Sequence, residues 1–144
     1  MFIRNPIVPE LIVMGLTASL DFWVTQLGFE IAYQRSEEGF AYLDLHGAQI
    51  MLEQYDPGAG QWLTAPLEKP LGRGINLQID VPAVAPVLLR LAAIGWPLFR
   101  DVEDAWYRAG EVEAGQRQFI VQDPDGYLVR LVQRLGERPV GSHS

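Results

Sequence analysis

The chain has 144 residues, of which 49% are hydrophobic, and its 11 Lys and Arg against 18 Asp and Glu give a formal net charge of −7. This length and composition predict one compact domain, or two small modules packed together. The chain contains no cysteine, which excludes disulfides, zinc–thiolate sites and cysteine nucleophiles. The acidic balance opposes nucleic-acid binding, because phosphate contacts require clustered Lys and Arg. Its only histidines are His46 and His143, so metal and triad chemistry lack their usual residues.

The N-terminal stretch MFIRNPIVPELIV is interrupted by two prolines and a glutamate, so it lacks the continuous apolar segment of a signal peptide. No apolar run elsewhere is long enough to span a bilayer. We therefore expect a cytoplasmic protein that has no membrane partner. The negative charge would favour a cationic ligand, although such a charge also simply keeps a small protein soluble.

Five elements follow one another in the first half of the chain. Residues 7–13 (IVPELIV) predict a strand, and residues 17–28 (TASLDFWVTQLG) predict a helix that ends at a glycine. Helical spacing places five apolar residues on one face of this helix: Leu16, Leu20, Trp23, Val24 and Leu27. Three strands are predicted next, over residues 29–35, 39–45 and 48–54.

The second half of the chain repeats this order of elements. A strand is predicted over 75–81, a helix over 82–95, and strands over 96–100, 116–122 and 127–133. Both predicted helices end at a tripeptide of one apolar residue, glycine and one aromatic residue: Leu-Gly-Phe in the first half and Ile-Gly-Trp in the second. The repeat predicts two βαβββ modules, with boundaries as follows: module one at about 6–54, a Gly- and Pro-rich linker over 55–73, module two at about 74–134, and a polar tail over 135–144.

The paired modules, the segment SLDFWVTQLGFEI and the final DPDGYLVRL together resemble a known family. The chain is similar, over about residues 6–136, to the vicinal oxygen chelate superfamily, which includes glyoxalase I, extradiol dioxygenases, fosfomycin-resistance transferases and bleomycin-resistance proteins. This resemblance implies a glyoxalase/bleomycin-resistance/dioxygenase-like α+β fold, in which two βαβββ modules form a half-barrel cleft over one domain of residues 1–144. One such scaffold hosts several chemistries, so function has to be argued from the residues of the site.

The ending DPDGYLVRLVQ and the start VPELIV are most similar to the bleomycin-resistance branch. Members of that branch are not enzymes; they sequester a cationic glycopeptide antibiotic at the interface of a dimer whose first strands are exchanged. The resemblance therefore implies a homodimer, with Pro9 at the hinge of the exchange. The chain sequence leaves open whether strands are exchanged between chains or closed within one.

Metal-dependent members of the superfamily place His, Glu or Gln ligands on the first and last strands of each module. Counting from the helices and glycines aligns these four positions with Val8, Met51, Asn76 and Arg130. This set lacks the anionic oxygens and imidazoles that a divalent ion requires, and Arg130 adds a fixed positive charge. We therefore expect neither a metal nor another cofactor.

Arg130 lies in the middle of an otherwise apolar strand, where a buried guanidinium needs a partner. Glu10 and Glu53 each lie two residues from a ligand position on the same strand face, so one of them is predicted to form a salt bridge with Arg130. The alternative is that both acids are displaced metal ligands in a glyoxalase-like or dioxygenase-like enzyme.

The remaining candidates are aromatic residues that the resemblance places near the cleft. Trp62 and Trp106 are expected in polar loops, whereas Trp23 and Trp96 are expected in the core. Residues 100–119 are interpreted as a flap over the cleft, against the alternative of a surface hairpin with solvated charges. The predicted ligand-binding residues are Tyr33, Phe40, Tyr42, Met51, Glu53, Trp62, Asn76, Trp106, Tyr107, Phe119 and Arg130. No catalytic residue is predicted, and the expected function is to bind and sequester a small molecule.

Overall fold

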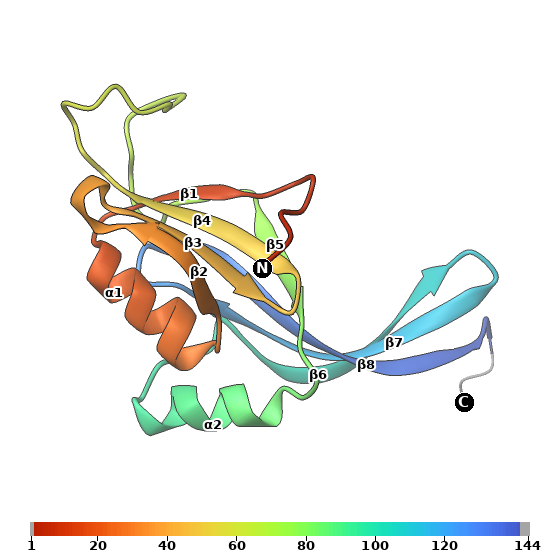
Figure 1. The fold of residues 1–144 in the computed structure, drawn as a ribbon. Coiled ribbons are helices and arrows are strands. Elements are labelled where there is room, and N and C mark those ends of the chain that lie inside the picture. Colours follow the sequence, from red (N-terminus) through yellow and green to blue (C-terminus); the bar gives the residue numbers. More distant parts are fainter. Residues whose placement is uncertain (1, 142–144) are drawn as a thin grey trace. The chain divides into compact units, whose positions relative to one another are not determined.

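The computed structural model describes residues 2–141, and their chain path is drawn in Figure 1. The chain divides into two compact units. The first contains the residues up to Arg73 together with Asp123–Tyr127, and the second contains Gly74–Gln122 together with the residues from Leu128 onward. No helix within residues 2–141 is long and apolar enough to cross a membrane. His143 lies outside the described residues.

The first unit is built on a four-stranded sheet, which we call the first sheet. Its elements are β1 (Glu10–Val13), α1 (Leu16–Leu20) continued by a π-helix (Asp21–Gln26), β2 (Glu30–Arg35), a 3₁₀ turn (Ser36–Glu38), β3 (Phe40–Leu45) and β4 (Ala48–Gln54). The strand order is β1-β4-β3-β2, and the first and last strands, β1 and β4, pair in parallel. This arrangement is the predicted βαβββ module.

The second unit has the same topology on a second sheet. Its elements are β5 (Asn76–Asp80), α2 (Ala85–Ala93), β6 (Arg100–Ala109), β7 (Val112–Gln122) and β8 (Leu128–Pro139). The strand order is β5-β8-β7-β6, and β5 pairs in parallel with β8. The predicted repeat and the α+β class are therefore confirmed, and both four-stranded sheets are open rather than closed into barrels.

The first strand is shorter than its sequence suggests. β1 begins at Glu10 rather than at residue 7, although the Pro9 carbonyl already accepts a hydrogen bond from the Met51 amide at 2.8 Å. Proline has no N–H to donate to a neighbouring strand, so regular pairing starts only after Pro9.

The buried face of the first helix also differs from the prediction. Trp23 and Leu27 are buried as expected, but Ser19 and Phe22 are buried beside them, whereas Leu16 is only partly covered. The helix changes to π-type hydrogen bonding at Asp21, and the wider turn rotates the residues that follow relative to an ideal helix. The prediction assumed 3.6 residues per turn throughout.

The largest difference lies in the second unit, where the predicted strand over 96–100 is wrong, while the interpretation of residues 100–119 as a flap over a cleft stays a prediction. Residues from Arg100 to Gln122 form a long hairpin of β6 and β7. Cross-strand ion pairs stabilise it: Arg117 donates to both carboxylate oxygens of Asp104, at 2.8 and 3.0 Å. β8 extends to Pro139, so the first part of the predicted tail is also strand. Figure 1 shows these three strands running beyond the end of α2.

The turn that precedes β8 belongs to the first unit, about a hundred residues away from its partners in sequence. The Asp123 carboxylate accepts hydrogen bonds from the Asp125 and Tyr127 amides, both at 2.9 Å, and from the Trp23 indole at 3.2 Å. Gly126 closes the turn at φ 104°, and a Cβ there would lie 2.5 Å from Pro70 Cβ. Glycine is therefore required both by the backbone conformation and by the space.

Burial raises the pKa of Asp123 to about 6, above its ordinary 3.8, although the three N–H donors oppose the shift. The folded protein thus holds this proton more tightly than the unfolded chain does. Its contribution to stability is complete below about pH 4 and is lost as the pH rises through 6, a change of up to about 3 kcal/mol.

Asp123→Asn removes this titration. The unfolding free energy of the wild type, minus that of the variant, should therefore fall by up to about 3 kcal/mol between about pH 4 and pH 6.5 in urea titrations. A difference that stays constant over this range would show that Asp123 is not a buried titrating group.

Candidate ligand-binding site

The first sheet has one face toward α1 and one face that we call the outer face. Successive side chains on a strand alternate between the two faces, and residues paired across neighbouring strands lie on the same face. The pairing of Glu10 with Met51 and of Tyr42 with Met51 therefore shows which residues of each strand lie on the outer face. The outer-face residues are Glu10, Ile12, Tyr33, Arg35, Phe40, Tyr42, Asp44, Gln49, Met51 and Glu53. Five residues predicted to bind a ligand are therefore together on one surface.

A hollow of about 610 Å³ opens at the β1–β4 side of the outer face. Its lining consists of Val8, Glu10, Ile12, Met51, Glu53 and residues 59–62. Trp62 stands on the linker loop at its edge with 94% of its surface exposed, as the sequence predicted for a loop tryptophan. The hollow therefore combines two carboxylates with a large aromatic surface and has no basic residue in its lining.

Parallel pairing of β1 with β4 brings the two carboxylates of this hollow close to each other. Burial raises the pKa of Glu10, the neighbouring Glu53 carboxylate raises it further, and Arg35 lowers it. A cation in the hollow would be attracted by both acids. The proximity of two like charges is the electrostatic feature that distinguishes this surface.

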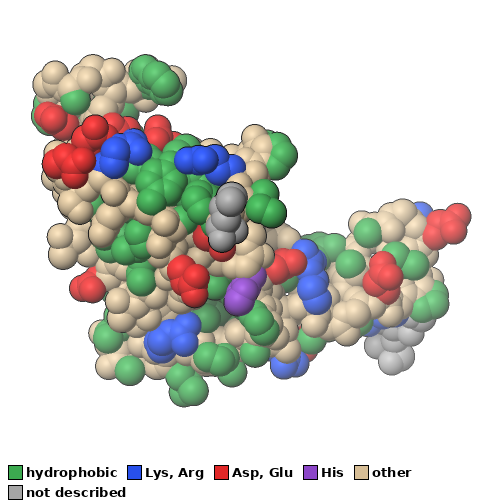
Figure 2. Space-filling model, viewed as in Figure 1, with side chains coloured by type: hydrophobic (Ala, Val, Ile, Leu, Met, Phe, Trp, Pro, Cys, Tyr) green, Lys and Arg blue, Asp and Glu red, His purple; other side chains and the backbone are tan. Residues whose placement is uncertain are grey.

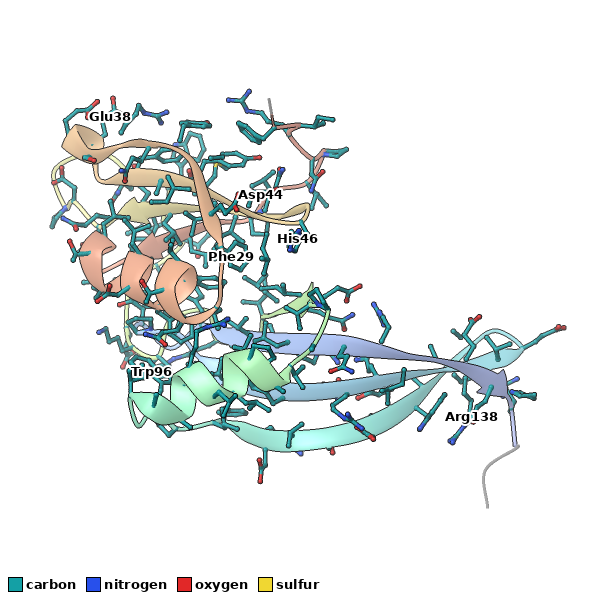
Figure 3. The ribbon with its side chains drawn as sticks, turned by 60° about the horizontal axis from the view of Figure 1, so that its bottom comes forward. Phe29, Glu38, Asp44, His46, Trp96 and Arg138 are labelled. Atoms are coloured by element: carbon teal, nitrogen blue, oxygen red, sulfur yellow. The ribbon has the colours of Figure 1, made fainter. Side chains whose placement is uncertain are left out.

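The β2–β3 side of the outer face is aromatic. The rings of Tyr33 and Tyr42 stack with centroids 5.3 Å apart and planes at 22°, and Phe40 lies 5.9 Å from Tyr33. The Arg35 guanidinium lies 4.1 Å from the Phe40 centroid and pairs with Glu38. Figure 3 labels Glu38 at one end of this sheet and Asp44 at the other. At the upper left of Figure 2, acidic, basic and hydrophobic side chains lie next to one another.

The second unit carries a smaller hollow of about 330 Å³ on its own sheet. It is lined by Asn76, Phe99, Arg100, Glu103, Tyr107, Gln118, Ile120, Leu128 and Arg130. Arg130 thus lies on the predicted strand face, beside Asn76 and Leu128. Its Nε atom is buried and has no hydrogen-bond partner among the described residues. The predicted partners Glu10 and Glu53 belong to the other unit, so the salt bridge stays a prediction.

Two of the predicted ligand-binding residues lie elsewhere in the second unit. Phe119 is fully buried, because strand alternation places it on the opposite face of β7 from Gln118, which lines the hollow. Trp106 lies in strand β6 rather than in a loop. A Cβ on Gly115 would come within 2.6 Å of its ring, and the Arg138 guanidinium lies 4.1 Å from its centroid. Trp106 therefore packs within the hairpin.

Sequence reasoning missed two glutamines that contribute to these surfaces, and it placed one tryptophan too deep. Gln118 donates to the Tyr107 hydroxyl at 2.7 Å and to Glu103 at 3.2 Å, and Gln49 accepts from the Tyr42 hydroxyl at 2.7 Å. Both glutamines are buried and lie in predicted strands, which is the signal that could have identified them. Trp96, expected in the core, is only partly covered and donates to the Gln122 carbonyl at 2.9 Å.

The residues at the four superfamily ligand positions do not fit a divalent metal ion. Val8 has no donor atom, Met51 offers only a thioether, Asn76 offers a neutral amide and Arg130 is cationic. Among residues 2–141, no three His, Cys, Asp or Glu side chains gather in a group that could hold a metal. Glu10 and Glu53 make only a pair.

Comparison with solved structures decides the family. A glyoxalase/bleomycin resistance protein/dioxygenase superfamily member from Vibrio splendidus 12B01 is 39% identical to this chain, over 89% of this chain and 97% of its own length, with a TM-score of 0.39. The chain belongs to this superfamily. Neither a protein-family model nor a curated protein matches it.

Two further structures share the superfamily fold at lower identity. TioX from Micromonospora sp. ML1 is 21% identical over 92% of this chain and 100% of its own, with a TM-score of 0.66. A bleomycin resistance determinant encoded on the transposon Tn5 is 20% identical over 92% and 99%, with a TM-score of 0.59. The resemblance inferred from the repeated modules is confirmed.

The pKa of Glu10 depends on how close Glu53 and Arg35 lie to it, so measuring this pKa tests the arrangement of charges at the hollow of the outer face. Glu53→Gln should lower it by removing a neighbouring negative charge, and Arg35→Gln should raise it by removing an attractive positive one. Carboxyl ¹³C NMR titration of the two variants measures both shifts, with Asp21→Asn on the exposed helix surface as the matched control. An unchanged Glu10 pKa in Glu53→Gln would mean that the two carboxylates are not neighbours.

Proposed function

We propose that this protein binds and sequesters a cationic organic small molecule in the cytoplasm, without a metal ion and without catalysing a reaction. The observation that carries the proposal is the Glu10–Glu53 pair in the hollow of the outer face. These acids lie beside positions where metal-dependent relatives hold an ion, but Val8 and Met51, which occupy those positions in this hollow, are poor metal ligands. An organic cation would supply the missing positive charge.

The shape and chemistry of the hollow suit a ligand larger than an ion. Its volume of about 610 Å³ lies within the range of small-molecule sites. Ile12, Met51 and Trp62 add apolar and aromatic surface, on which planar heteroaromatic rings can stack and cations can bind over the indole. The net charge of −7 attracts a cation from a distance.

A bleomycin-type glycopeptide is the ligand class that we propose to test first. Such a molecule combines cationic groups with planar heteroaromatic rings, which match the two kinds of surface in the hollow. The Tn5 neighbour, identified as a bleomycin resistance determinant, has the same fold. Because that neighbour is 20% identical to this chain, it motivates the choice of ligand without assigning it.

Titration of the purified protein with metal-free bleomycin-type glycopeptides, followed by tryptophan fluorescence, tests the proposal. The exposed Trp62 should report occupancy, and affinity should fall as salt rises. The double variant Glu10→Gln/Glu53→Gln should bind about tenfold or more weakly, while the control Asp21→Asn should bind like the wild type. Equal affinity of the double variant and the wild type would contradict the proposal.

We also propose that the working form is a homodimer of two such chains. The support is the superfamily resemblance and the position of Pro9, where regular pairing of the first strand begins. Light scattering at micromolar concentration should give twice the chain mass of 16.1 kDa. A particle of one chain mass would contradict this part of the proposal.

A further inference from the structure

The aromatic part of the outer face is occupied by the N-terminal segment of the chain itself, residues 2–5. The Phe2 ring lies 5.2 Å from the Tyr42 centroid and 6.0 Å from that of Tyr33. The Arg4 guanidinium lies 5.5 Å from the centroids of Phe2 and Tyr33 and 5.9 Å from that of Tyr42. Its Nη2 donates to the Tyr33 hydroxyl at 3.2 Å. One aromatic ring and one planar cation therefore fill this surface.

A single buried amide, Gln49, holds the backbone of this segment. Its Oε1 accepts from the Asn5 amide at 2.9 Å, and its Nε2 donates to the Ile3 carbonyl at 2.7 Å. The same amide also bonds to the Tyr42 hydroxyl at 2.7 Å and to Asp44 at 2.9 Å. Gln49 is thus a fixed polar group at the edge of the aromatic surface, and it offers one donor and one acceptor to whatever lies there.

The segment covers Tyr42 on the outer face of the first sheet, away from α1. Phe40 and Tyr42 are only 5% and 2% exposed, although they lie on the face away from α1. Phe2 and Arg4 contact Tyr42 directly, and Arg35 covers Phe40. If the segment moved away, a stack of aromatic rings would be open to ligands.

The segment is attached by hydrogen bonds, including one from the Asn5 side chain to the Gly47 carbonyl, and by ring contacts, rather than by strand pairing or by a set of buried aliphatic side chains. It forms no part of a strand, since β1 starts only at Glu10, and prolines at 6 and 9 deprive it of two backbone donors. Ile3 and Ile7 are 81% and 83% exposed, so their side chains bury almost nothing. Segments with few buried apolar contacts open at a small fraction of the global unfolding free energy.

We propose that the aromatic face is a binding site for an aromatic cation, and that Phe2 and Arg4 occupy it as an internal competitor. The inference rests on the proposed function and deepens it by naming the ligand class and the group that the ligand displaces. Once Arg4 has moved off the sheet, the outer face carries three carboxylates, Glu10, Asp44 and Glu53, and one basic strand residue, Arg35. The surface is then negative on balance and favours a cation. Competition lowers apparent affinity by the fraction of molecules whose face is open.

Calorimetric titration with benzamidine, a planar aromatic cation, tests this inference, with neutral benzamide as the isosteric control ligand. The double variant Phe2→Ala/Arg4→Gln should bind benzamidine about tenfold more tightly than the wild type, because its internal competitor is lost. The affinity for benzamide should rise much less from the wild type to the double variant, because benzamide carries no charge. A variant with Ile7→Ala, an exposed residue between the segment and β1, should bind benzamidine like the wild type.

A third substitution tests whether the tighter benzamidine binding of the double variant takes place on the aromatic face. Tyr33→Leu added to the double variant should abolish the gain, because it removes the ring that contacts both Phe2 and Arg4. Equal benzamidine affinity in the double variant and the wild type, or no measurable binding to either, would overturn the inference. The proposed function fails separately, when glycopeptide binding is absent or is insensitive to loss of Glu10 and Glu53.

Discussion

Parallel pairing of the first and last strands in each βαβββ module is the constraint on which both candidate surfaces depend. In the first unit it sets Glu10 against Met51 and Ile12 against Glu53, so residues about forty positions apart share one surface. In the second unit it sets Asn76 beside Leu128 and Gln78 beside Arg130. The fold therefore brings the same two strand positions together twice, whatever residues occupy them, and the chemistry of the protein follows from the occupants.

In this chain those occupants include charged side chains in both units, Glu10 and Glu53 in the first and Arg130 in the second. In the first unit, burial and the neighbouring Glu53 carboxylate raise the pKa of Glu10, and in the second unit the Nε atom of Arg130 is buried without a hydrogen-bond partner among the described residues. Unsatisfied buried charge is costly, and it persists in proteins where a partner or ligand compensates it. The residues at the four superfamily ligand positions, Val8, Met51, Asn76 and Arg130, do not suit a divalent metal centre.

Local signals predicted most of the fold, and non-local contacts explain what they missed. β4 matches its predicted bounds residue for residue, because its alternating pattern and flanking glycine are local features. β6 escaped prediction because its first half is rich in charges that become favourable only opposite Arg117 on the neighbouring strand. The shared face of Met51 and Glu53 followed from alternation along one strand, but nothing near Phe2 or Arg4 in sequence indicates that they cover Tyr33 and Tyr42. Phe119 was predicted to bind a ligand, but the alternation of β7 places it on the buried face opposite Gln118.

Metal binding tests the central claim most directly, because the superfamily positions either hold an ion or leave charges for an organic ligand. Protein treated with a chelator and dialysed should be titrated calorimetrically with Zn²⁺, Mn²⁺ and Ni²⁺, and its metal content measured after purification. We predict well below one equivalent of any metal as purified and no saturable, stoichiometric binding in the titrations. One equivalent per chain that is lost in both Glu10→Gln and Glu53→Gln would contradict the account and would identify the carboxylate pair as part of a displaced metal site.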